Sequence, residues 1–187
     1  MGAVTVGVDI GQSNDPTALC VAEKVPEQLL VRHLARLPLG TEYPAVVRHI
    51  AELTDAVRDR TGTAPTTVVD ATGVGKPIVD ALWAEDRPVV AVYLTAGHKR
   101  SCRRLGARPI YSLGKARMVS RLQALVQTDR LRLPRTAEAR ALAKELHNYE
   151  IRVDDDGHAR FGAFKSGTHD DLATALALAV DFGMDPP

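Results

Sequence analysis

Residues 4–23 read VTVGVDIGQSNDPTALCVAE, and this stretch decides the fold class. Its leading valines alternate with smaller or polar residues, which is the period-two pattern of a β-strand, so Asp9 points away from the valine face where the strand ends. Turn-forming residues at 11–16 then lead into a second β-rich run at 17–23. The stretch therefore predicts a β-hairpin with a carboxylate at the end of its first strand.

The rest of the chain alternates strand and helix patterns without internal repeats. Further strands are expected at 28–37, 66–70 and 88–94. Apolar residues at helical spacing predict helices at 46–57, from 77 onward, at 115–129, at 137–148 and at 168–182. A second hairpin is expected around the turn Asp156–Gly157, with strands at 149–153 and 158–164. This order predicts an α/β fold with a central mixed five-stranded sheet flanked by helices and an additional C-terminal β-hairpin.

The composition fits one well-cored domain. The chain has 187 residues, of which 45% are hydrophobic, so we expect a single domain over residues 1–187. A formal net charge of +1 gives no overall attraction to nucleic acid, so DNA affinity must come from local clusters of Lys and Arg. Cys20 and Cys102 lack the spacing of metal ligands, and no stretch resembles a signal sequence or a membrane span. We therefore expect a cytoplasmic protein with no membrane partner.

Aspartates stand where three of the predicted elements change direction. Asp9 ends the first strand, Asp70 ends the strand at 66–70, and Asp170 and Asp171 open the last helix. Carboxylates are hard oxygen ligands suited to Mg²⁺ or Mn²⁺, and two such ions roughly 3.5–4 Å apart can bind both the attacking and the leaving oxygen of a phosphodiester. The spacing therefore predicts a two-metal nuclease centre.

The acidic start of the last helix also has a simpler interpretation. Thr168 can cap free N–H groups there, and the helix dipole favours a carboxylate in the first turn. Capping accounts for one acidic residue, whereas a second one at the head of a buried helix carries an electrostatic cost unless a cation is present. A histidine at a helix start, such as His169, is more often solvated or capping than catalytic. We prefer the metal centre because turn or capping roles would have to be invoked again for Asp9 and for Asp70.

Positive charge gathers after the strand at 88–94, in a segment without a helical stripe. Its members are Lys99, Arg100, Arg103, Arg104 and Arg108. A solvated loop is expected here, and its place beside the acidic residues fits contact with DNA phosphates, which supply most sequence-independent affinity. The aromatic content of 4% argues against extensive base stacking, so we expect binding to the backbone of double-stranded DNA. Either an extension of this surface or an ordinary polar helix face accounts for Lys115, Arg117 and Arg121.

Two more motifs resemble functional sites without meeting their requirements. Residues 73–76 read GVGK, yet a Walker A loop needs glycine in place of Asp70 and Ser or Thr in place of Pro77. We expect these glycines to let the backbone turn tightly beside the metals, with Lys76 near a DNA phosphate. The aspartates at 154–156 precede a glycine and are assigned to a solvated hairpin turn outside the site.

Several stretches together resemble a known family. They are GVDIGQSNDPTALCVAE at 7–23, VVDATGVGKPIVDAL at 68–82, KARMVSRLQALVQTDRLRLP at 115–134 and HDDLATALALA at 169–179. In order and spacing they resemble the RNase H-like nuclease domain of the large terminase subunits of tailed phages, over essentially the whole chain. The resemblance implies a metal-dependent DNA endonuclease that cuts concatemeric viral DNA during genome packaging.

Carried over residue by residue, the resemblance implies that Asp9 bridges two divalent metal ions, Mg²⁺ or Mn²⁺, and that Asp70 completes one metal site. Asp171 completes the other, with Asp170 as an additional or water-mediated ligand. The metals would lower the pKa of a bound water, so no Ser, Cys or His nucleophile is needed. The family also implies a terminase ATPase domain, a small terminase subunit and the portal as partners. A complete large subunit carries an ATPase motor ahead of its nuclease, which this chain lacks.

Three other classes of protein share parts of the pattern. A Holliday-junction resolvase has the same fold and metal chemistry, but should be an obligate two-fold dimer that prefers branched DNA. The turns after Asp9 and Asp70 resemble phosphate loops of actin-like ATPases and sugar kinases, which use the core twice and need a longer chain. A DNA-binding module without catalysis is opposed by the retained carboxylates.

Overall fold

The computed structural model describes residues 2–11, 15–148, 150–153, 159–162 and 170–187. Strands β1 to β10 span, in order, Ala3–Asp9, Ala18–Lys24, Leu29–Arg36, Thr66–Asp70, Val89–Thr95, Arg100–Leu105, Arg108–Gly114, Leu131–Arg132, Glu150–Val153 and Ala159–Gly162. Helices α1 to α5 span Tyr43–Thr61, Gly75–Ala84, Lys115–Gln127, Ala137–Asn148 and Asp171–Met184. Within these residues no helix combines the length and apolarity that a membrane span requires.

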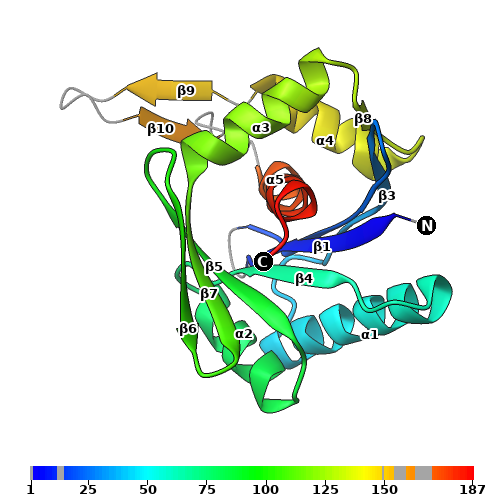
Figure 1. The fold of residues 1–187 in the computed structure, drawn as a ribbon, viewed down its shortest axis with the longest axis vertical. Coiled ribbons are helices and arrows are strands. Elements are labelled where there is room, and N and C mark those ends of the chain that lie inside the picture. Colours follow the sequence, from blue (N-terminus) through cyan, green and yellow to red (C-terminus); the bar gives the residue numbers. More distant parts are fainter. Residues whose placement is uncertain (1, 12–14, 149, 154–158, 163–169) are drawn as a thin grey trace.

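The main sheet has the strand order β6-β7-β5-β4-β1-β2-β3-β8 (Figure 1). Its central strands β1, β4, β5 and β7 are parallel neighbours, so their carboxyl ends meet at one edge of the sheet. β2 is antiparallel to both β1 and β3, and β6 is antiparallel to β7 at the sheet edge. Chemistry-bearing residues that follow the parallel strands are therefore gathered on one side of the molecule.

Helices cover both faces of this sheet. α1 and α2 pack on one face, over valines of β1 and β4, whereas α3, α4 and α5 form the layer on the other face. Figure 1 shows α5 packed over β1, between the sheet and the pair α3 and α4. Nearly every residue of α5 is buried, which explains why its sequence is apolar almost all round.

The contact between α5 and β1 depends on Gly7. A methyl group built on Gly7 would lie 2.1 Å from the carbonyl oxygen of Ala175 and 2.8 Å from the backbone nitrogen of Ala179. Both neighbours are backbone atoms of a buried helix, so neither can move aside without shifting the helix. Glycine is therefore required here because it lets the helix backbone approach the strand.

The predicted α/β class, the mixed sheet and the late hairpin of β9 and β10 are confirmed, but the predicted strand count is wrong. The described part of the main sheet has eight strands rather than five. The basic segment predicted as a loop is the hairpin of β6 and β7. β6 is an exposed edge strand, so it lacks the apolar alternation that reveals a strand in sequence. The turn Asp156–Gly157 lies outside the described residues.

Replacing Gly7 by alanine should destabilise the fold by about 3 kcal/mol, at the upper end of the usual cost of overpacking, because the neighbouring atoms are backbone atoms of a buried helix. Urea denaturation followed by circular dichroism measures the change. Ala3→Val adds methyl groups at an exposed position of the same strand and should change stability by less than about 0.5 kcal/mol. Equal stabilities of the two variants would contradict the close approach of α5 to β1.

Candidate metal centre

The sheet brings Asp9 and Asp70 side by side. The parallel register of β1 and β4 pairs the residues that directly precede these two aspartates, and neighbouring strands lie about 4.8 Å apart. Gly7 faces α5, so strand alternation turns Asp9 toward α5 as well. Val68 packs in the same layer as α5, so Asp70, two residues later, also faces it. This geometry confirms that Asp9 points away from the valine face.

The direction of α5 brings its first turn to the same place. Thr5 lies beside Gly183, and Gly7 lies beside residues 175–179, so the helix runs antiparallel to β1. Two residues of a strand span about 6.6 Å, and four residues of a helix span about 6 Å. Each step of two residues along β1 therefore corresponds to a step of about four residues back along α5. The end of β1 therefore lies opposite the first turn of α5.

The first turn of α5 contains the other two predicted carboxylates. Asp170 is the N-cap residue, with φ −132°, and Asp171 is the first helical residue. The helix begins later than the predicted residue 168, and the Asp170 side chain makes no capping hydrogen bond. Thr168 and His169 lie outside the described residues, so their predicted capping and solvated roles stay predictions.

The carboxylates act on one another electrostatically. Burial raises the pKa of Asp9 well above its usual value, and the charges of Asp70, Asp170 and Asp171 raise it further. Burial also raises the pKa of Asp70, although hydrogen bonds from Thr72 oppose this, and the Thr72 N–H donates to Asp70 Oδ1 at 2.8 Å. Asp70 and Asp171 are 8% and 3% exposed, whereas Asp9 and Asp170 are half-buried. The carboxylates from three elements are therefore close enough to disfavour ionisation of Asp9.

This donor set fits a hard divalent cation, because all of its ligating atoms are carboxylate oxygens. Across the described ranges, no group of three or more His, Cys, Asp or Glu side chains is arranged to hold a metal ion as it stands. Like charges repel, so binding of a divalent cation would draw Asp9, Asp70 and the α5 carboxylates closer together.

Two residues beside the centre have no counterpart in the sequence prediction. Arg36, the last residue of β3, donates from Nε to Asp171 Oδ2 at 2.5 Å and forms an ion pair with Glu145 of α4. Glu145 Oε2 in turn accepts a hydrogen bond at 2.8 Å from the backbone N–H of Ala173, in the first turn of α5. The sequence gives no signal for this arrangement, because the burial of Glu145 and the identity of its partners exist only in the fold.

Lys115 is the cation that follows β7 at the same edge of the sheet. Its charge lowers the pKa of both Asp9 and Asp70, in opposition to burial. From the sequence, Lys115 is assigned either to an extension of the basic surface or to a polar helix face, because a single sequence does not reveal that β7, β5, β4 and β1 are parallel neighbours. In the structure Lys115 lies close enough to the acidic centre to act on Asp9 and Asp70.

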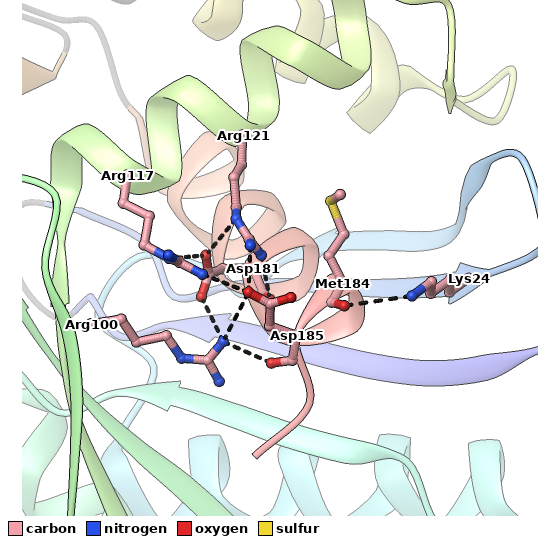
Figure 2. Close-up of polar contacts among 7 residues, drawn as sticks. All are labelled: Lys24, Arg100, Arg117, Arg121, Asp181, Met184 and Asp185. Carbon is pink, nitrogen blue, oxygen red and sulfur yellow. Dashed lines mark hydrogen bonds and ion pairs between the residues drawn. The ribbon is translucent and has the colours of Figure 1, made fainter.

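The predicted DNA-contact residues separate into two groups. Arg100 is bound to α5: its Nη1 lies 3.3 Å from Asp181 Oδ2, and its guanidinium lies over the rings of Tyr111 and Phe182. Figure 2 shows Arg100 converging on Asp181 with Arg117 and Arg121. Asp181 is fully buried, so Arg100 and the two arginines of α3 hold α5 in place, and we leave them out of the proposed DNA contacts.

The remaining cations are exposed. Lys99, Arg103 and Arg104 project from the β6 hairpin, and Lys76 forms an exposed ion pair with Asp80 on α2. Arg108 is also exposed, although its guanidinium lies 5.1 Å from the ring centre of Trp83. The aspartates at 154–156, which the sequence assigns to a hairpin turn, lie outside the described residues.

The model of the family described as Terminase RNaseH-like domain matches residues 6–181. The chain belongs to this family. The matched range of the terminase domain runs from β1 to α5 and includes all four aspartates of the centre. Membership supports a phage DNA-packaging nuclease as the class of protein. A search of curated protein sequences finds no match to the chain.

Solved structures of phage terminase nucleases are similar to this terminase domain. The large terminase nuclease from thermophilic phage G20c with bound magnesium is 22% identical, with a TM-score of 0.69 over 96% of this chain and 80% of that chain. The nuclease domain from Thermus phage P74-26 is 19% identical, with a TM-score of 0.64 over 99% and 82%. The large terminase nuclease domain from bacteriophage SPP1 with bound Mn is 13% identical, with a TM-score of 0.58 over 98% and 86%. At these identities the likeness shows a shared RNase H-like fold, which confirms the predicted fold class.

The raised pKa of Asp9 makes the metal-free protein pH-sensitive. Folding favours protonated Asp9, so this stabilisation is complete below the unfolded-state pKa of about 3.9 and is lost as pH rises through the folded-state value. In EDTA at neutral pH, Asp9→Asn should therefore raise Tm by at least about 2 °C, and the gain should vanish near pH 4. Thermal melts from pH 4 to 8 measure it.

Asp59→Asn is the matched control for this experiment, because it removes the same charge from an exposed side chain on α1. It should leave the pH dependence of Tm unchanged. A lower Tm for Asp9→Asn at every pH would contradict the electrostatic repulsion described above.

Proposed function

We propose that this chain is a metal-dependent DNA endonuclease that cleaves viral concatemeric DNA during genome packaging by two-metal phosphodiester hydrolysis. The observation that carries the proposal is the convergence of carboxylates from β1, β4 and α5, with the charges of three of them raising the pKa of the fourth, Asp9. Such repulsion is offset when a divalent cation binds. The family match makes DNA packaging the setting of this chemistry.

The roles proposed for the aspartates are those that the family resemblance implies, and their positions are compatible with them. Asp9, which lies beside Asp70 and opposite the first turn of α5, would bridge two ions, Mg²⁺ or Mn²⁺. Asp70 completes one site, and Asp171 with Asp170 completes the other. When bound, the ions lower the pKa of a water molecule and stabilise charge on the phosphate. The magnesium and Mn bound by the G20c and SPP1 nucleases support divalent cations as the cofactors.

The proposed substrate is double-stranded DNA, contacted through its phosphates by Lys76 and by exposed side chains along the edge strand β6. Lys99 lies at the end of β6 nearest the metal centre, because its carbonyl oxygen accepts from the N–H of Gly114, the residue before Lys115. Arg103 and Arg104 follow at roughly 13 and 17 Å along the strand. Exposed Arg108 follows at the start of β7 and extends this surface. Cations at these separations match backbone binding with little sequence readout.

The proposed biological partners are a terminase ATPase domain, a small terminase subunit and the portal. We also propose that residues 1–187 form one nuclease domain without an ATPase. In support, a solved large terminase from another thermophilic bacteriophage has a TM-score of 0.65 to this chain, at 8% identity, and the match covers 96% of this chain but only 39% of that chain.

Asp70→Ala should abolish metal-dependent cleavage of supercoiled plasmid. Loss of a metal ligand should lower the cleavage rate at least about 100-fold, because even substitution of residues that hydrogen-bond to metal ligands lowers metal affinity or activity about 10–100-fold. Assays in Mn²⁺, Mg²⁺ and EDTA measure it, with Asp59→Ala as the control that removes an exposed carboxylate from α1. Cutting in EDTA, or equal cutting by Asp70→Ala, would sink the assignment. Faster cutting of four-way junctions than of linear duplex would favour a resolvase instead.

The double substitution Arg103→Gln with Arg104→Gln should weaken DNA binding and its salt dependence. Two lost phosphate contacts should reduce the slope of log K against log salt by about 2. Fluorescence anisotropy with duplex DNA in EDTA measures the slope without cleavage. The pair Arg48→Gln and Arg60→Gln removes two exposed arginines from α1, outside the β6 hairpin, and should leave the slope unchanged. An unchanged slope for the β6 variant would remove this surface from the proposal.

A further inference from the structure

Arg36 shares one row of the sheet with the metal-centre aspartates. Asp9 of β1 pairs with Ala18 of β2, and Ala18 pairs with Arg36 of β3, so the three residues lie side by side on adjacent strands. Directly paired residues point to the same face of a sheet, and Ala18 packs in the α5 layer. Because Ala18 is small, it leaves space above it between Asp9 and Arg36.

The carboxylate of Asp171 enters this row from α5. Its Oδ2 accepts a hydrogen bond from Arg36 Nε at 2.5 Å, while Asp171 itself is 3% exposed. Arg36 approaches from the side of β3, and Asp9 lies on the other side, across Ala18. The Arg36 contact therefore fixes the direction in which Asp171 presents its carboxylate to the centre.

Glu145 fixes Arg36 in turn. Its side chain is 6% exposed and pairs with Arg36 through Oε1, while Oε2 accepts from the Ala173 N–H at 2.8 Å. Glu145 thus caps the N-terminus of α5 from a neighbouring helix, in place of the local cap that Asp170 does not provide. A planar guanidinium can bind two carboxylates at fixed angles, which a lysine ammonium cannot do.

We propose that Arg36, held by Glu145, is a positioning residue that orients Asp171 for binding of the divalent cation. The proposal rests on the proposed function, because it concerns the same metal centre. Neither Arg36 nor Glu145 needs to touch the metal or the DNA. Residues that orient metal ligands in this way typically affect metal affinity by about 10–100-fold.

A purely structural ion pair is the alternative, and charge-preserving variants separate the two. Arg36→Lys keeps the positive charge but loses the guanidinium geometry, so the electrostatic potential at the centre stays similar. Glu145→Asp keeps the negative charge but is too short to reach both Arg36 and the Ala173 N–H. Arg32→Lys is the matched control, because Arg32 lies on the same strand and pairs with Glu23.

The test is the Kd for Mn²⁺ of each variant by isothermal titration calorimetry, at a temperature where circular dichroism shows all of them folded. We expect the Kd to rise about 10–100-fold in Arg36→Lys and in Glu145→Asp, and less than about twofold in Arg32→Lys. Glu145→Asp carries the test alone if Arg36→Lys does not fold.

Two results would overturn the inference in distinguishable ways. If the wild-type chain binds Mn²⁺ and both variants bind it as tightly as Arg32→Lys, Arg36 and Glu145 are structural only, and the proposed function stands. If the wild-type chain does not bind Mn²⁺, the proposed function fails and the positioning role fails with it.

Discussion

The close approach of α5 to β1 is the constraint on which the rest of the structure depends. Gly7 allows the helix backbone to reach the strand, and no side chain larger than hydrogen fits at that position. Asp9 follows Gly7 by two residues on the same face of β1, so the approach that packs the helix also sets the separation between Asp9 and the first turn of α5. Core packing and site geometry therefore have one cause, and a change that lifts α5 from the sheet affects both.

Electrostatics differ at the two ends of α5. At the C-terminal end, Asp181 and Asp185 are bound by the arginines Arg100, Arg117 and Arg121, so the described positive side chains outnumber the negative ones (Figure 2). At the N-terminal end, Arg36 pairs with Asp171 and Glu145, and the charge of Lys115 acts on Asp9 and Asp70. The first end is neutralised by the protein and fixes the helix. At the second end the charges of Asp70, Asp170 and Asp171 act against ionisation of Asp9, and a bound cation would relieve this repulsion.

The sequence predicts individual helices and strands better than it predicts which of them lie next to one another in the fold. The valine alternation of β1 and the apolar pattern of α5 are local signals, so the strand-end position of Asp9 and the burial of α5 follow from them directly. The role of Arg36 could not be predicted because it depends on the strand register across β1, β2 and β3. The role of Lys115 could not be predicted because it depends on the parallel strand order that ends at β7. Because β6 is exposed, its sequence has no alternating apolar pattern, and the segment is therefore predicted as a loop. The partners of Arg100 likewise exist only once α5 is packed.

A crystal structure with Mn²⁺, located by anomalous scattering, would show directly whether the four aspartates hold two metal ions. Two anomalous peaks are expected, roughly 3.5–4 Å apart. They should lie between the strand-end carboxylates Asp9 and Asp70 and the first turn of α5, with Asp9 contacting both. Mn²⁺ bound elsewhere on the molecule, with no peak among these carboxylates, would contradict this expectation.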